Sequence, residues 1–569
     1  MDKIFSYINS NNICQIDVPK YGSANNIPYE FNIPYDLVIH NKKVVVCLPD
    51  NYSLKLYYEY MKNLYPEIRI GYADIKDVSY NLSTQINYIT QRYLKYKLLH
   101  HKGDYTKLLN FADIIIIFNP DMNDNNNIFS ISIFKYNDDN NILFPKLCII
   151  NSKYTFKLTE KHVFFKDDKS RLKCFDINNI DNNSIIKNTV DIIKSNYYKY
   201  QNEANLLIYV SNIKTAVSIN NILKIILSGC KIYIICSDYV NTINTFSEIF
   251  KEKTKKIIIA VDFKEFYFHN IDLIIDTINS KQENFKILKK EQLVKDLSHL
   301  IIDYVKCDIP LMRLPLKTIT EKFSNINVKN TIGLLKNLNL LIDNDDKLLI
   351  SAVGIFFETI KLSPVKTFFL WEWISMGNPI YEGLIIILLI DESLPLIDLV
   401  YHQNWIGISP LHTYLNMLQS FTSSNKNNIQ NIIKNFDKDD ILICKNWAID
   451  NKIHHIRFMS LITNISNYYN KITKELRNVN ISINNFNIES IIEKSLAILT
   501  KIYFMDILII KNNAIVQPHN NIKYLLNRNC FKNNLTDNKI IPLSLRLTKN
   551  NSKNELKIKT VYIDNFIII

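Results

Sequence analysis

The amino-acid sequence predicts an α/β protein in which two tandem, doubly wound α/β lobes precede mostly helical domains and a small C-terminal β domain. Up to about residue 290, short apolar runs alternate with amphipathic stretches in two successive blocks. Beyond that point apolar residues recur mainly at helical spacing, and the last segment returns to short strand-like runs. Buried strands separated by helices are typical of parallel sheets with right-handed crossovers, so each block predicts one lobe.

The first lobe is predicted over residues 1–165. Three apolar runs are predicted as buried parallel strands, and two amphipathic stretches as the helices between them. Two clusters rich in Asn and Asp are predicted as surface loops. The strands are 43–49, 113–118 and 147–151, the helices are 52–65 and 86–101, and the loops are 123–127 and 137–141.

The second lobe is predicted over residues 166–290. Residues 291–345 contain helical patterns and a short hairpin, which suits a winged helix, and helical patterns continue over 346–476. The last domain is predicted over 477–569, and within it residues 506–569 alternate in short strand-like runs, which favours a small barrel. The strands of the second lobe are expected at 205–211, 231–237, 256–262 and 271–276.

The composition bears on partners and on location. A formal net charge of +13 suits a partner whose phosphates it can neutralise. An A/T-rich genome, such as that of a large DNA virus, would also enrich Lys together with Asn, Ile and Tyr. The nine cysteines form no CxxC pair, which favours free buried thiols in a reducing compartment. The strongest apolar run, 383–390, is too short to span a membrane, and no signal peptide is apparent, so a cytoplasmic location is expected.

The order of elements resembles the DEAH-box family of RNA helicases over nearly the whole chain. The first-lobe stretches that carry the resemblance are IGYADIKDVSYNLSTQINYITQRYLKYKLL at 70–99 and LLNFADIIIIFNP at 108–120. Residues 331–364, 444–465 and 514–520 resemble later parts of the family. The first-lobe positions that match family residues are Gly71, Tyr72, Ile86, Tyr88, Thr90 and Leu94.

The resemblance implies a fold for each segment. It implies two RecA-like lobes at 1–165 and 166–290, a winged helix at 291–345, a helical ratchet-like domain at 346–476 and an OB-like domain at 477–569. It also places Gly354 and Pro364 on turns.

The segment YGSANNIPYEF at 21–31 resembles a degenerate phosphate-binding loop. Such a loop needs inward-facing backbone amides, a Lys for the phosphates and a hydroxyl for Mg²⁺. Gly22 and Ser23 are retained as vestigial cofactor-binding residues, and the alternative is an unrelated polar loop. The Ser-Ala-Thr motif of the family appears as Asn-Ser-Lys at 151–153.

Four groups that phosphoryl transfer requires in the family are missing from their positions. Asn25 and Asn26 replace the centre of the phosphate loop, while Phe118 and Asn119 replace two carboxylates. No arginine lies between residues 171 and 313, and lysine cannot reproduce the planar guanidinium fork. We therefore predict no catalytic residue, no metal and no cofactor. ATP and Mg²⁺ enter only if the chain is an active but divergent helicase.

Nucleic-acid binding could survive this loss. The resemblance places Pro49, Thr90 and Ser211 near positions that contact the backbone of a bound strand, with Arg92 and Lys95 close to Thr90. We expect Arg92 and Lys95 to be exposed, so that replacing both with Glu weakens RNA binding with little effect on stability. Thr90 suits helix capping equally well.

The sequence thus predicts a helicase-like, catalytically inactive nucleic-acid-binding or scaffold subunit for RNA transcription or processing. Its expected partners are RNA or another nucleic acid, together with proteins of a viral transcription or RNA-processing complex, and no membrane. Its expected location is the host cytoplasm or a virion. One alternative is an active but divergent ATP-dependent RNA helicase. A second is a purely structural virion or interaction protein that no longer binds RNA.

Overall fold

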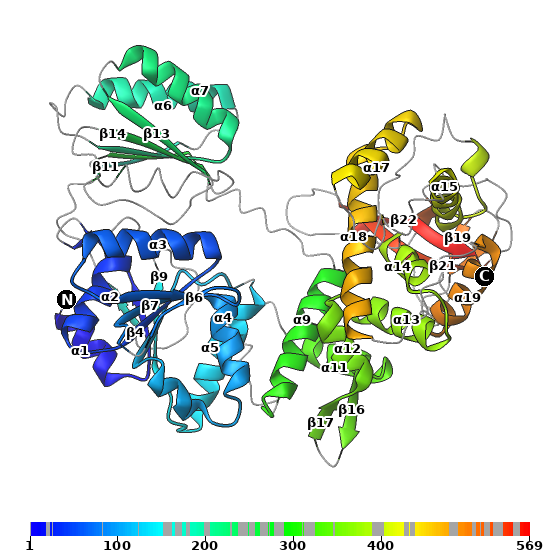
Figure 1. Cartoon of the computed structure of the whole chain (residues 1–569), viewed down its shortest axis with the longest axis horizontal. Helices are drawn as coiled ribbons and strands as arrows, with labels where there is room; N and C mark the ends of the chain where they lie inside the picture. The colour runs from blue at the N-terminus through cyan, green and yellow to red at the C-terminus, as the bar shows by residue number, and fades with distance from the viewer. Residues whose placement is uncertain are drawn as a thin grey trace. The chain divides into compact units, whose positions relative to one another are not determined.

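The described part of the chain divides into two compact units, Met1–Lys329 and Asn330–Ile569 (Figure 1). The computed structural model describes residues 2–18, 23–24, 27–81, 83–122, 124–151, 162–164, 173–177, 182–197, 205–227, 230–236, 249, 256–261, 271, 273–277, 290–309, 311, 325–344, 347–389, 403–425, 432, 438–476, 487–502, 508–511, 514–516, 524–526, 539–549 and 558–568.

The first unit opens with an eight-stranded sheet in the order β10-β1-β9-β8-β4-β7-β5-β6. Its neighbouring strands are parallel except for β5 and β6. The prediction that 43–49 and 113–118 are neighbouring buried strands is confirmed, because β4 pairs with β8 from Val44↔Ile114 to Cys47↔Ile117. The strands are β1 (Ile13–Asp17), β4 (Val44–Leu48), β5 (Ile70–Ala73), β6 (Val78–Ser79), β7 (Ile86–Thr90), β8 (Ile114–Phe118), β9 (Lys146–Asn151) and β10 (His162–Phe164).

Helices cover both faces of this sheet, and we call the sheet with these helices the first lobe. Val44, Val46 and Ile116 share a core with α1, α2 and α3. Val45 and Ile115 point to the opposite face, where α4 and α5 lie. A sheet buried on both faces explains why its strands are continuous apolar runs. The helices are α1 (Asp2–Ser10), α2 (Tyr29–Ile39), α3 (Asn51–Leu64), α4 (Gln91–His100) and α5 (Asn125–Asp139), with a short 3-10 helix at Tyr105–Asn110.

Two sequence predictions for the first lobe are wrong. Residues 86–90 are not the start of a helix but strand β7, because they pair with β4 and β5 and are buried. The clusters at 123–127 and 137–141 are largely the two ends of helix α5 rather than loops. Asp124 caps that helix by accepting a hydrogen bond from the Asn126 amide at 3.0 Å, and Asn127 is buried.

A second, five-stranded sheet follows and is parallel throughout, in the order β11-β15-β12-β14-β13. The four strands expected from the sequence are confirmed within a residue or two at each end, and β11 was not predicted. Figure 1 shows α6 and α7 together along one face of this sheet. The elements are β11 (Lys173–Asp176), α6 (Asn182–Tyr197), β12 (Leu206–Val210), α7 (Ile213–Ile226), β13 (Lys231–Cys236), β14 (Lys256–Val261) and β15 (Leu273–Asp276).

The helix that follows the second sheet in the sequence, α9 (Lys290–Lys306), packs against the first lobe. Asn125 Nδ2 on α5 donates a hydrogen bond to the Asp296 carbonyl oxygen at 2.7 Å. The rings of Phe129 and Tyr304 stack with their centroids 5.3 Å apart. The first lobe is therefore completed by a segment that lies beyond the second sheet in the chain.

The second unit begins within α11, which leads into the antiparallel hairpin of β16 and β17, as the sequence predicts. The following helices enclose an apolar core that includes Trp373, Leu384 and Phe421. The helices and hairpin strands are α11 (Asn325–Asn337), β16 (Leu341–Asn344), β17 (Lys347–Ile350), α12 (Ala352–Ile360), α13 (Pro364–Ser375), α14 (Ile380–Leu389), α15 (Pro410–Ser424), α17 (Lys438–Asp450), α18 (His455–Glu475) and α19 (Ile488–Ile502), with a 3-10 turn at Gln403–Trp405.

The expectation that Gly354 lies on a turn is wrong, whereas Pro364 is the first residue of α13. Gly354 lies in the first turn of α12, where an added Cβ would collide with the Leu340 carbonyl oxygen. Close approach of two backbones, rather than a turn, therefore requires glycine at this position.

The C-terminal strands form a closed barrel in the order β18-β19-β20-β22-β21, which agrees with the small barrel expected from the sequence. Among the described helices of the chain, none is both long enough and apolar enough to cross a bilayer. The barrel strands are β18 (Leu508–Lys511), β19 (Ala514–Val516), β20 (Tyr524–Leu526), β21 (Lys539–Lys549) and β22 (Ile558–Ile568).

Candidate functional site

The candidate site lies at the carboxyl edge of the first sheet. In a parallel α/β sheet, ligands bind in the crevice beyond the carboxyl ends of the strands. The neighbouring strands β1 and β9 end there in the polar residues Asp17 and Asn151, and β7 ends in Thr90. Pro49 and Asn119 directly follow β4 and β8.

Asp17 and Asn151 form a buried polar pair on neighbouring strands. Asn151 Nδ2 donates a hydrogen bond to Asp17 Oδ1 at 3.1 Å, and Gln15 Nε2 approaches the same oxygen at 3.4 Å. The Val18 amide donates to the Asn151 carbonyl oxygen at 2.8 Å and fixes the strand ends beside each other. Asp17 is 2% exposed and Asn151 is 1% exposed, so water does not solvate this pair.

The pair presents acceptor oxygens at the carboxyl edge of the sheet. Asp17 Oδ2 and Asn151 Oδ1 are buried, and neither has a hydrogen-bond partner among the described residues. Phosphate recognition needs donors, namely amides, hydroxyls and cations. A carboxylate beside a polyphosphate would instead repel it, and little water is present to screen that repulsion.

A short hairpin occupies the segment that resembles the phosphate loop. Strands β2 (Ser23–Ala24) and β3 (Ile27–Pro28) pair antiparallel in the register Ser23↔Pro28 and Ala24↔Ile27, and α2 begins at the next residue. Antiparallel pairing directs backbone groups at the partner strand rather than at a ligand. Ser23 thus lies in a hairpin strand, while Gly22 and the residues at 25–26 lie outside the described residues.

The end of β8 offers no catalytic carboxylate at the positions where the resemblance implies two. Phe118 is buried, and its neighbour Asn119 turns the chain with a left-handed φ of 41°. The Asn119 amide donates to the Ile150 carbonyl oxygen at 2.9 Å, which ties the turn to β9. Within the described ranges, no group of three or more His, Cys, Asp or Glu side chains is arranged to hold a metal ion.

Thr90 is the N-cap of helix α4, so the capping role expected as an alternative is confirmed. Its Oγ1 accepts a hydrogen bond from the Tyr93 amide at 3.1 Å, and the residue is 5% exposed. Contact between Thr90 and a nucleic-acid backbone stays a prediction. Arg92 lies two residues into the helix and is exposed, as expected.

Lys95 is not exposed, and that expectation is wrong. Its ammonium group forms an ion pair with Asp303 of α9, and it also lies 5.4 Å from the ring centroid of Phe129. The side chains of Lys95 and Asp303 are only 18% and 11% exposed. The Glu substitution proposed from the sequence would thus place two like charges in a largely buried contact. Lys95 joins α4 to α9, a structural role that helical periodicity alone could not reveal.

Pro49 and Ser211 are both exposed, and each directly follows the carboxyl end of a parallel strand, β4 or β12. The residue after each proposed contact caps the next helix. Asp50 Oδ1 accepts from the Ser53 amide at 2.7 Å, and Asn212 Oδ1 accepts from the Thr215 amide at 2.9 Å. Both positions are compatible with backbone contacts to a ligand, which remain predictions.

Sequence reasoning missed Asp17 as a site residue. The available signal was the strand-like run ICQIDVP, in which two polar residues interrupt an apolar strand that the fold buries on both faces. Asn151 was noticed only as the start of a replaced motif. Their contact spans 134 residues of sequence, so no local pattern indicates it.

No protein-family model and no curated protein sequence matches this chain. Among solved structures, the chain is similar to the crystal structure of the E. coli DExH-box NTPase HrpB, with 9% identity and a TM-score of 0.46. That similarity covers 100% of this chain and 67% of the other. A second crystal structure, of the Escherichia coli DEAH/RHA helicase HrpB, has 9% identity, a TM-score of 0.49 and coverage of 100% and 69%. Similarities this distant do not indicate what this chain binds or does.

Proposed function

We propose that this chain is a helicase-like protein that binds nucleic acid without hydrolysing ATP, as an RNA-binding or scaffold subunit of a viral transcription or RNA-processing complex. The proposal assigns the two parallel sheets to RecA-like lobes, the segment around the β16–β17 hairpin to a winged helix, the later helices to a ratchet-like domain and the barrel to an OB-like domain. The sequence resemblance to DEAH-box helicases and the succession of these elements support it.

The observation that carries the loss of ATPase activity is the buried Asp17–Asn151 pair at the end of β1. Among the described residues, the pair offers acceptor oxygens without a hydrogen-bond partner where phosphates must meet donors. The paired β2–β3 hairpin also supports the loss of ATPase activity. So does the absence of the family's lysine, carboxylates and arginines from their positions in the sequence. Losing one stabilising donor in an active site costs about 3–4 kcal/mol of barrier, so the joint loss of these groups leaves no route to turnover.

Retained binding is supported by charge and by position. The chain carries a net charge of +13. Arg92, Pro49 and Ser211 are exposed near the carboxyl edges of their sheets. Binding through phosphate neutralisation is independent of base sequence and falls steeply as salt rises.

The test combines a steady-state phosphate-release assay with RNA-binding anisotropy on the purified full-length chain. We expect no ATP turnover above background with or without RNA, and salt-sensitive RNA binding. Turnover that disappears when residues 22–28 are replaced by a Gly/Ser linker of equal length would establish the active-helicase alternative. Undetectable RNA binding at low salt would favour the structural alternative.

A further inference from the structure

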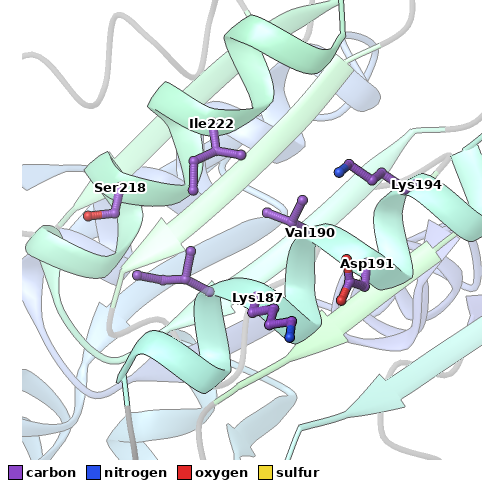
Figure 2. Close-up of a pocket in the computed structure, with 7 residues that line it drawn as sticks. Lys187, Val190, Asp191, Lys194, Ser218 and Ile222 are labelled. Atoms are coloured by element: carbon purple, nitrogen blue, oxygen red, sulfur yellow. The ribbon is translucent and has the colours of Figure 1, made fainter.

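The helices of the second sheet border a groove that the proposed function does not use. The groove has a volume of about 430 Å³ and lies between α6 and α7. Ile186 and Val190 of α6 and Ile222 of α7 supply its apolar side chains. Figure 2 shows Ser218 and Ile222 on one helix, with Val190, Asp191 and the two lysines Lys187 and Lys194 on the other.

The charged side chains of the groove are not neutralised within the fold. Lys187, Asp191 and Lys194 occupy one face of α6 at helical spacing, and the two lysines are separated by about 10 Å along the axis. Among the described residues, none of these three forms an ion pair, and all three are exposed. Lys214 lies four residues before Ser218 and therefore on the same side of α7. It is a third exposed lysine beside the groove. Lysines therefore outnumber the acidic residue on this surface.

The apolar surface continues beyond the groove along α7. Ile225 follows Ile222 by three residues, on the same side of α7, and is 85% exposed. An apolar groove that continues into an exposed isoleucine and is rimmed by charged side chains has the make-up of a protein-binding surface. The lining contains no aromatic ring on which a nucleobase could stack, which favours a protein over a nucleic acid.

We propose that the α6–α7 groove binds a helical segment of a partner protein whose apolar row is flanked by Asp or Glu. The apolar row would lie over Val190, Ile222 and Ile225, because amphipathic helices bind grooves through residues spaced by one helical turn. The flanking carboxylates would pair with Lys187, Lys194 and Lys214, which sets the charge of the partner. This interaction requires neither ATP nor RNA.

The probe is a synthetic, fluorescein-labelled amphipathic helix with Leu at positions i, i+3 and i+7 and Glu on both flanks, titrated into the full-length chain. We expect micromolar binding that weakens with salt, and a matched peptide with Lys in place of Glu should bind at least tenfold more weakly. Carbodiimide coupling should join peptide carboxylates to Lys187 and Lys194, as peptide mapping would detect.

Three variants separate the groove from the rest of α7. The pair Lys187→Glu and Lys194→Glu should weaken binding at least tenfold, and Ile225→Asp at least fivefold. Ile225→Asp alters a side chain that is already in solvent, so it should fold normally. Lys224→Glu changes an exposed lysine outside the lining of the groove and should alter affinity less than twofold.

Three results would overturn the proposal. They are absent binding of the acidic peptide, equal binding to all variants, and a pair of lysine substitutions that weakens single-stranded RNA binding while leaving peptide binding intact. The last result would assign the surface to nucleic acid.

Discussion

The amide of Asn151 donates a hydrogen bond to the carboxyl group of Asp17 at 3.1 Å, across the ends of two neighbouring parallel strands. The contact joins the ends of β1 and β9 at the carboxyl edge of the first sheet. Here both positions are buried and acceptor-rich. The hydrogen bond ties β1 to β9 at the edge of the sheet.

Asn151→Asp should destabilise the protein in a pH-dependent manner. Two carboxyl groups within hydrogen-bond distance share one proton, so the pKa of one rises above its unfolded value. Stability is then retained at low pH and lost as pH rises through the raised pKa. We expect the Tm of Asn151→Asp to fall between pH 5.5 and 8 by more than that of the wild type.

Asn151→Ala is the control for this experiment. It removes the same hydrogen bond at a cost of about 1–3 kcal/mol but adds no titrating group. Parallel Tm curves for the Ala and Asp variants across pH would contradict the like-charge explanation.

Lys95→Glu should lower stability by about 1–3 kcal/mol, because it opposes Asp303 with a like charge in a contact that is mostly buried. Arg92→Glu, three residues earlier on the exposed face of the same helix, should stay within about 0.5 kcal/mol of the wild type. Urea unfolding of both variants measures the difference. The double variant Lys95→Glu with Asp303→Lys should recover part of the loss, and no recovery would mean that the pair contributes little.

Arg92→Glu is the clean test of RNA binding at this edge of the lobe, because it leaves the α4–α9 contact intact. We expect a three- to tenfold loss of affinity, about 0.7–1.4 kcal/mol, for any RNA sequence. The slope of log affinity against log salt should flatten by about one phosphate contact. Anisotropy at several salt concentrations measures both quantities. Unchanged affinity and slope would show that bound RNA does not pass the start of α4.

Glu382→Gln should stabilise the second unit at alkaline pH. Glu382 is 6% exposed and accepts a hydrogen bond from Tyr381 Oη at 3.3 Å, and burial raises the pKa of its carboxyl group. A raised folded-state pKa means that stability is present at low pH and lost as pH rises. The Tm advantage of the Gln variant should therefore be larger at pH 8 than at pH 5. A Gln variant that is less stable at pH 8 would mean that the attraction of Tyr381 and Lys494 for the ionised carboxylate outweighs the cost of its burial.

The sequence predicted the strands that depend on local composition alone. The runs around Val44 and Ile114 are apolar at every position, and both are central strands. By contrast, β7 contains the polar residue Asn87 and ends in Thr90, so its composition does not indicate a buried strand. Packing in the sheet nevertheless buries both residues. Packing likewise buries Asn127 and Asn137 within helix α5, although the local composition indicated loops.

From the sequence, the candidate site could be predicted only through the phosphate- and metal-binding residues that it lacks. The absent lysine, carboxylates and arginines are visible in the sequence. The Asp17–Asn151 pair and the Lys95–Asp303 ion pair each require knowledge of which distant segments become neighbours. Both depend on long-range topology, which side-chain patterns within one element do not contain.

The packing of α9 against α4 and α5 has a consequence for synthesis on the ribosome. The partners of Lys95, Asn125 and Phe129 leave the exit tunnel only after residues 165–289 have been made. Domains generally fold as units from the N-terminus during translation. The first lobe therefore completes its packing only after α9 has been made, and until then the parts of α4 and α5 that α9 contacts stay uncovered by it.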